Sequence, residues 1–198
     1  MSEEILINVT PRETRVAVVE NGMLQEVHIE RASRRGYVGN VYKGRVQRVM
    51  PGMQAAFVDV GLERAAFLHA SDVIKLPVNG VVEEADAGPV PTPPISSLVH
   101  EGQDIIVQVV KDPIGSKGAR VTTQLSIPSR CLVLLPYARV LGVSVRIEDE
   151  DERNRLKQLV GGLVGEDGPG LIVRTNAEGA GEQALAEDVA YLKRVWTL

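Results

Sequence analysis

The chain has 198 residues, 44% of them hydrophobic, and a formal net charge of -4. This composition is ordinary for a globular protein and fits one large domain or two small ones. The single cysteine, Cys131, excludes an internal disulfide and a cysteine-rich zinc site made by this chain alone. The N-terminal MSEEILINVT has acidic residues where a signal peptide needs basic ones, so the sequence does not predict secretion. No apolar run reaches the roughly 18 residues of a membrane span. We therefore expect a cytoplasmic protein.

Basic residues gather in one part of this acidic chain. Residues 31–58 hold six arginines and lysines and no aspartate or glutamate, so this segment carries a charge of about +6. Non-specific affinity for nucleic acid comes mainly from phosphate neutralisation, so the overall charge argues against a general polyanion binder. Any contact with RNA or DNA is expected to be local.

The first elements are three strands of a meander, at residues 5–9, 15–19 and 24–30. Asn21-Gly22 is a strong hairpin signal, because a type I′ turn needs a positive φ at both central positions. Apolar and polar residues alternate in the third strand, as in a half-buried sheet. Such a sheet needs a cover, which must come from elsewhere.

Three short strands follow at residues 41–47, 54–60 and 66–69. Alternation places Lys43 and Arg45 together on one face of the first strand. The other two strands carry the only phenylalanines of the chain, Phe57 and Phe67, which with His69 can form one exposed platform. Phenylalanine is more often a core residue, but a platform beside a basic strand suits base stacking.

Residues 75–97 contain several prolines and lack periodicity, so we predict a mobile insertion on a loop. Strands resume at 105–110 and 119–127, separated by a glycine-flanked turn that holds Lys117. This lysine is either simply solvated or a phosphate contact. Five short strands with one long loop are typical of a small Greek-key barrel such as the OB-fold, although periodicity alone does not distinguish it from an SH3-like barrel.

The remaining chain mixes strands and helices. We predict a buried strand at 131–135, a helix that starts near 149–151, a strand at 171–173 and a final helix over 182–198. Arg174 and Thr175 follow the last strand, where an arginine fork, a hydroxyl and loop N–H groups can hold a terminal phosphate. The competing interpretation pairs Arg174 with the acidic residues 148–152. The three histidines lack metal-ligand spacing, and no catalytic or metal-binding set stands out.

Several motifs resemble a known family. The run FVDVGLERAAFLHASD, residues 57–72, looks like the S1 RNA-binding domain, which is an OB-fold. Together with INVTPRETRVAVVENG, VGNVYKGRV, VQVVKDPIGSKGAR and LIVRTNAEG, it resembles the amino-terminal part of the bacterial ribonuclease E/G family, nearest to its ribonuclease G branch. The helix that ends uncapped at Leu198 leads us to expect further chain beyond it.

The resemblance implies an α+β, mostly β, fold with three parts: an RNase H-like meander (1–36), an S1-type barrel (37–127) and a 5′-monophosphate sensor region (128–198). It implies RNA contacts at Phe57, Phe67 and Lys117, to which the basic strand and the platform add three positions: Lys43, Arg45, His69. Its 5′-phosphate contacts fall on four positions: Ser129, Val133, Arg174, Thr175.

The resemblance also implies an endoribonuclease of ribosomal and messenger RNA. In that family the Mg²⁺-binding aspartates and the zinc-binding cysteines that join subunits lie in later sequence. We therefore expect this chain to hold no cofactor, to bind single-stranded RNA, preferably 5′-monophosphorylated, and not to cut it. Only the longer protein is expected to form homo-oligomers. The alternative is a self-sufficient S1-type RNA-binding module without nuclease activity.

Overall fold

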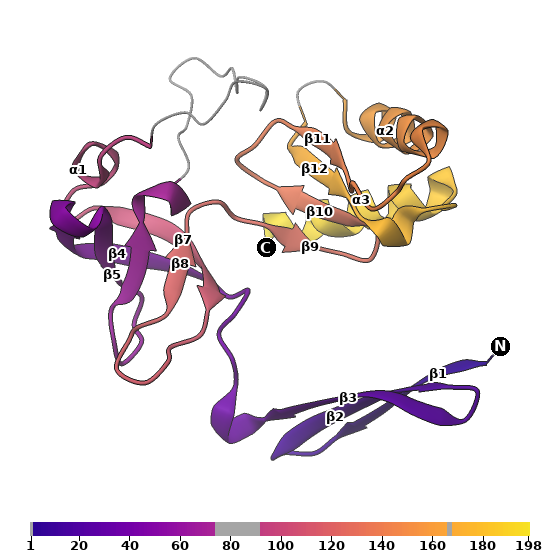
Figure 1. The fold of residues 1–198 in the computed structure, drawn as a ribbon, viewed down its shortest axis with the longest axis horizontal. Coiled ribbons are helices and arrows are strands. Elements are labelled where there is room, and N and C mark those ends of the chain that lie inside the picture. The colour runs from indigo at the N-terminus through magenta and orange to yellow at the C-terminus, as the bar shows by residue number, and fades with distance from the viewer. Residues whose placement is uncertain (1, 74–91, 166–167) are drawn as a thin grey trace. The chain divides into compact units, whose positions relative to one another are not determined.

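The computed structural model describes residues 2–73, 92–165 and 168–198 (Figure 1). The chain divides into two compact units, Met1–Tyr37 and Val38–Leu198. Within the described parts of the chain, no helix is both long enough and apolar enough to cross a membrane.

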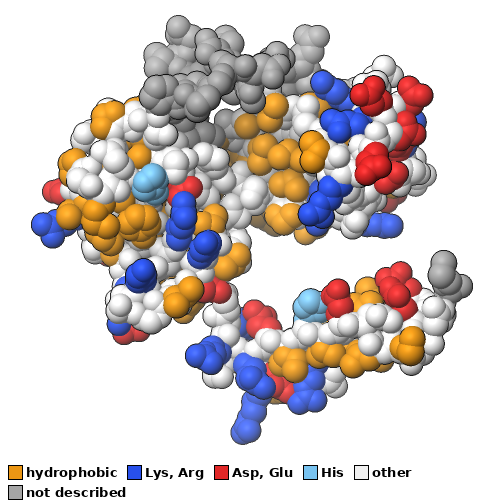
Figure 2. Space-filling view, in the orientation of Figure 1, with side chains coloured by type: hydrophobic (Ala, Val, Ile, Leu, Met, Phe, Trp, Pro, Cys, Tyr) orange, Lys and Arg blue, Asp and Glu red, His pale blue; other side chains and the backbone are white. Residues whose placement is uncertain are grey.

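The first unit is the predicted meander. It consists of β1 (Glu3–Val9), β2 (Glu13–Glu20) and β3 (Met23–Arg31), antiparallel in that order, and it ends in the 3₁₀ turn η1 (Ala32–Arg34). Asn21 and Gly22 have φ angles of 50° and 78°, which confirms the predicted turn. Every residue of β1 and β3 is exposed, so the predicted half-buried alternation is absent from these strands. Figure 2 shows hydrophobic side chains along this unit.

The second unit begins with a closed barrel of five strands, as predicted. Its strands are β4 (Val41–Met50), β5 (Ala55–Asp59), β6 (Ala66–His69), β7 (Asp104–Lys111) and β8 (Arg120–Thr122). They close in the order β4-β5-β6-β8-β7, and only the β6–β8 pair is parallel. Short 3₁₀ turns follow β4 and β6: η2 (Pro51–Met53) and η3 (Ala70–Asp72). Alternate residues point inward and are buried, including Val46, Val58, Leu68, Val107 and Val121.

Two predicted boundaries in this region differ from the structure. The last barrel strand ends at Thr122 and not at residue 127, because the Thr122 hydroxyl accepts a hydrogen bond from the Gln124 N–H and turns the chain. The predicted insertion, 75–97, lies mostly outside the described residues. Its final residues begin the short helix α1 (Ile95–Leu98), and Ile95 is fully buried.

The rest of the unit is a four-stranded sheet with two helices. The strands β9 (Ile127–Pro128), β10 (Leu132–Leu135), β11 (Leu141–Val143) and β12 (Gly170–Val173) lie in the order β11-β12-β10-β9. The helices are α2 (Glu150–Val164) and α3 (Glu182–Thr197), and the 3₁₀ turn η4 (Thr175–Ala177) follows β12. The predicted strands at β10 and β12 and both predicted helices are confirmed, whereas β11 was not predicted.

Both helices pack on one face of this sheet. Leu132 and Leu134 of β10 join buried residues of both helices, Leu156 and Leu185 among them, in one hydrophobic core. Alternation turns the intervening residues of β10 and β12 toward the opposite face, where Val133 lies opposite Ile172. The fold therefore presents a helix-free sheet face within the described residues.

Candidate nucleic-acid interface

The predicted aromatic platform is present on the outside of the barrel. Phe57 on β5 lies opposite Phe67 on β6, and their ring centroids are 6.1 Å apart in an edge-to-face arrangement. The His69 ring, two residues along β6, stacks on Phe67 with a centroid distance of 6.5 Å. All three rings are half-buried, while the intervening Leu68 is fully buried inside the barrel. The rings therefore form one partly exposed surface of the kind on which bases stack.

Cationic side chains extend this platform on both sides. Arg48 of β4 lies opposite Phe57, and Arg120 of β8 lies opposite Phe67. Lys111 of β7 then lies opposite Arg120. Because directly paired residues share a face of the sheet, these five side chains form a single row around the barrel, here called the cation–aromatic row. Figure 2 shows Lys and Arg side chains beside hydrophobic ones on the visible face of the barrel.

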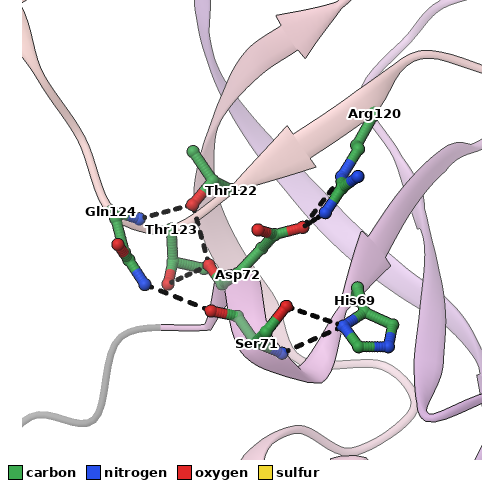
Figure 3. A network of polar contacts seen from close by, with 7 residues as sticks. All are labelled: His69, Ser71, Asp72, Arg120, Thr122, Thr123 and Gln124. Carbon is green, nitrogen blue, oxygen red and sulfur yellow. Dashed lines mark hydrogen bonds and ion pairs between the residues drawn. The ribbon is translucent and has the colours of Figure 1, made fainter.

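A polar network fixes the end of β6 against β8 (Figure 3). The Arg120 guanidinium donates to Oδ2 of Asp72 from Nε at 3.0 Å and from Nη2 at 2.8 Å. The Asp72 carbonyl accepts from the Thr122 hydroxyl at 2.8 Å, and the Ser71 carbonyl accepts from the Gln124 amide. These bonds tie η3 to β8 and to the chain that follows it.

The same network sets the tautomer of His69. The Ser71 N–H donates to Nδ1 of His69 at 3.2 Å, and the Ser71 hydroxyl also lies 2.8 Å from this nitrogen (Figure 3). Because Nδ1 accepts a hydrogen bond, the proton of the neutral ring is on Nε2. His69 therefore presents a donor from the edge of the aromatic platform.

The predicted basic face of β4 is present, but its charge is partly compensated. Asp104 of β7 pairs with Arg45 at 3.0 Å and with Lys43 at 3.5 Å. The hydrogen bond and the charge of Arg45, with a smaller contribution from Lys43, hold the pKa of the Asp104 carboxyl below its usual value. Both cations stay largely exposed, so they can still contact phosphate, at the cost of sharing Asp104.

Lys117 lies in an exposed turn beside β6. Gly115 in this turn has a φ of 57°, and the N–H of Lys117 bonds the carbonyl of Ile114. A Cβ on Gly118 would lie 2.0 Å from the carbonyl oxygen of Ala65, so only glycine allows the turn to approach the chain that leads into β6. The turn thus places Lys117 close to the strand that carries Phe67.

The four residues predicted to hold a 5′-phosphate lie around one end of the four-stranded sheet. Arg174 directly follows β12, and its Nη1 donates to the carbonyl oxygen of Ser129 at 2.5 Å. Val133 lies on the helix-free face of β10, and Thr175 begins η4. By alternation Arg174 follows Ile172 onto the same face. The structure therefore joins Arg174 to Ser129 directly and places Val133 and Thr175 in neighbouring elements.

Asp188 on α3 was not singled out from the sequence, yet it braces this region. Its Oδ2 accepts from the Ser129 hydroxyl at 2.6 Å, the Cys131 N–H at 2.8 Å and the Leu132 N–H at 3.0 Å. Arg174 adds a further bond to this loop, from its N–H to the Cys131 carbonyl. Burial, with the nearby Asp188 carboxylate, raises the pKa of the Cys131 thiol, so this cysteine is held in its unreactive form.

The acidic cluster at the start of α2 has a partner other than the predicted Arg174. Glu152 accepts two hydrogen bonds from Arg155, at 2.6 and 2.7 Å, and a third from the Gly179 N–H at 2.8 Å. These bonds, that of Arg155 foremost, lower the pKa of Glu152 to about 2. Pairing of Arg174 with this cluster was therefore the wrong alternative. Glu152 pairs with its (i, i+3) neighbour Arg155 on α2, and the Arg174 guanidinium bonds the Ser129 carbonyl instead.

No cluster of three or more histidine, cysteine, aspartate or glutamate side chains suited to a metal ion occurs in the described residues. The residues available in 2–73, 92–165 and 168–198 do not fit a catalytic Mg²⁺ or a structural Zn²⁺.

Comparisons with known proteins agree with these two regions. The family model of the S1 RNA binding domain matches residues 37–111, which hold most of the barrel. The family model of the Ribonuclease E/G family matches residues 126–198, which hold the second sheet and its helices.

Curated relatives match nearly the whole chain. Ribonuclease G of Escherichia coli (strain K12) is 59% identical over 197 residues, which is 100% of this chain and 40% of the relative. Ribonuclease G of Haemophilus influenzae is 58% identical over 98% of the chain and 39% of the relative. Ribonuclease E of Nostoc sp. is 38% identical over 91% of the chain and 24% of the relative. The chain thus spans about 40% of the length of the Ribonuclease G relatives that it matches.

Proposed function

Since the chain belongs to the ribonuclease E/G family, we propose that it is the RNA-binding and 5′-end-sensing part of a single-strand-specific endoribonuclease of the ribonuclease G type. The observation that carries the proposal is the Phe57–Phe67–His69 platform, flanked by cations, within the segment that matches the S1 domain. Stacking on such a platform accepts any base, whereas the cations bind the backbone. Single-stranded RNA is the ligand that offers both.

The 5′-sensing part of the proposal rests on a second cluster, formed by Ser129, Val133, Arg174 and Thr175. A terminal monophosphate carries more charge and more free oxygens than an internal phosphodiester, and it suits an arginine fork beside a hydroxyl. Arg174 is aligned by the Ser129 carbonyl, and Thr175 follows it at the start of η4. These residues, with Val133 on the same face, are the proposed contacts for the phosphate.

Cleavage belongs to other parts of the protein under this proposal. The relatives are ribonucleases, and enzymes that hydrolyse phosphodiesters generally use metal ions. The metal-binding carboxylates, the zinc-binding cysteines and the contacts of a homo-oligomer then lie outside this chain. The meander is the first piece of an RNase H-like subdomain that later sequence completes and covers. The whole protein would act in the cytoplasm on ribosomal RNA precursors and messenger RNA.

RNA binding is tested by fluorescence anisotropy with an unstructured 5′-hydroxyl oligonucleotide. We expect Phe57→Ala and Phe67→Ala to weaken binding by about 1–3 kcal/mol each, roughly 5- to 150-fold, because each removes a stacking surface. Tyr191→Ala is the matched control, because Tyr191 is an exposed aromatic residue on α3. Equal affinities for the parent chain and both phenylalanine variants would contradict the proposal.

The sensor is tested by comparing 5′-monophosphorylated with 5′-hydroxyl RNA of the same sequence. The parent chain is expected to prefer the monophosphate, and Arg174→Gln to lose that preference while it keeps its affinity for 5′-hydroxyl RNA. Arg194→Gln on α3 controls for the change in charge. RNA binding without any 5′ preference would instead favour the self-sufficient S1-type module. Under the proposal, neither RNA is cleaved by this chain in the presence of Mg²⁺.

A further inference from the structure

Two arginines enclose the aromatic pair along one line across the barrel. The strand registers place Arg48 opposite Phe57, Phe57 opposite Phe67, and Phe67 opposite Arg120. Neighbouring strands lie about 4.8 Å apart, so this part of the cation–aromatic row extends for roughly 14 Å across four strands. Its order is cation, aromatic, aromatic, cation, which fits two successive bases and the phosphates on the outer side of each.

Arg48 reaches the row only because β4 contains a β-bulge. Gly44 and Val46 are buried in the barrel, and strict alternation would turn Arg48 inward with them. The register between β4 and β5 shifts between Val46 and Arg48, which inserts one extra residue and reverses the alternation. Arg48 is consequently exposed and lies opposite Phe57. The bulge thus aims a cation at the aromatic pair.

Arg120 is held at the other side by an ion pair. Its Nε and Nη2 both donate to the same oxygen of Asp72, which leaves Nη1 and the guanidinium plane outside that pair (Figure 3). The side chain stays 42% exposed. A guanidinium fixed in this way can bind a phosphate or lie against a base with little loss of side-chain entropy. Asp72 therefore orients Arg120 beside Phe67.

We propose that an RNA strand crosses the barrel along this line, with successive bases on Phe57 and Phe67 and the flanking phosphates on Arg48 and Arg120. The inference rests on the proposed RNA-binding function and adds two positions and a path to it. The Phe57–Phe67 pair covers two strands of this line, and the two arginines extend it to four. The row runs perpendicular to the strands and so gives the path of the RNA across the barrel.

The test measures RNA affinity as a function of salt with a 5′-hydroxyl oligonucleotide, so that the phosphate sensor plays no part. The slope of log affinity against log salt concentration falls by about 0.7 for each phosphate of a single strand that the protein no longer neutralises. We expect Arg48→Gln and Arg120→Gln each to weaken binding and to reduce the slope by about this amount. Lys157→Gln on α2 removes the same charge from an exposed position away from the barrel strands and should leave the slope unchanged.

A further variant separates RNA binding by Arg120 from structural support. Asp72→Asn weakens the ion pair but keeps the Arg120 charge, so it should retain the salt slope of the parent chain. If Arg120→Gln lowers the urea midpoint of unfolding but leaves the salt slope of the parent chain unchanged, Arg120 supports the barrel only and the inference is wrong. The inference also fails if both arginine variants match Lys157→Gln while Phe57→Ala still weakens binding. A parent chain that does not bind RNA at all would refute the proposed function itself.

Discussion

Asp188 provides the sharpest test of how the second cluster is held together. Replacing it with alanine removes the carboxylate oxygen that accepts hydrogen bonds from three donors: the Ser129 hydroxyl and the N–H groups of Cys131 and Leu132. Cys131 and Leu132 are buried, so their N–H groups lose a partner where water does not readily replace it. An unsatisfied buried donor costs about 1–3 kcal/mol, so we expect Asp188→Ala to lower the free energy of unfolding by about 2–4 kcal/mol.

The loss of stability is measured by urea denaturation followed by the fluorescence of Trp196, the only tryptophan of the chain. This residue lies on α3, where its ring packs edge-to-face against Tyr137 at 5.7 Å, so its signal reports the same subdomain. Glu187→Ala is the control, because the Glu187 side chain is exposed. Its removal should change the free energy of unfolding by no more than about 0.5 kcal/mol. Asp188→Asn keeps one acceptor oxygen, so its free energy of unfolding should lie between those of Asp188→Ala and Glu187→Ala. An Asp188→Ala variant as stable as Glu187→Ala would refute the reasoning.

The remaining predictions concern pH and close packing. Hydrogen bonds from Arg155 lower the pKa of Glu152 to about 2, so its contribution to stability is complete above about pH 4.5 and disappears as the pH falls toward 2. At pH 7 the urea midpoint of Glu152→Gln should therefore be lower than that of the parent, and the difference should shrink at pH 3. Glu63→Gln, at an exposed position, is the control and should match the parent midpoint at both pH values. Gly118→Ala should destabilise the barrel by more than about 2 kcal/mol in thermal or urea unfolding, because its Cβ would meet a backbone carbonyl, whereas Gly52→Ala has open space and should be tolerated. Equal midpoints for the two alanine variants would contradict the steric argument.

Sequence patterns predict the elements whose periodicity is local. The meander turn at Asn21 and Gly22 follows from backbone conformations that few other residues adopt. The start of α2 follows from Asp149, whose side chain accepts the N–H groups of Asp151 and Glu152. The platform rings are also predictable, because alternation alone puts the aromatic side chains of two adjacent strands on one face.

The rest depends on contacts between distant segments. β11 is only three residues long, and it exists because it pairs in parallel with β12. Arg48 was visible in the sequence as one charge of a basic segment, but its place beside Phe57 depends on a bulge that alternation does not reveal. Asp188 lies on the second turn of an ordinary amphipathic helix, and nothing in the local sequence shows that three donors 56 to 59 residues away converge on it.

The strand order of the barrel has a consequence for how the protein can vary. β6 and β7 follow one another in the chain but are not neighbours, because β8 lies between them. No hairpin register therefore fixes the number of residues between these two strands. A change in that number is therefore not expected to shift the pairing of either strand with its own neighbours. A reporter sequence placed there should leave the aromatic platform and its arginines in register.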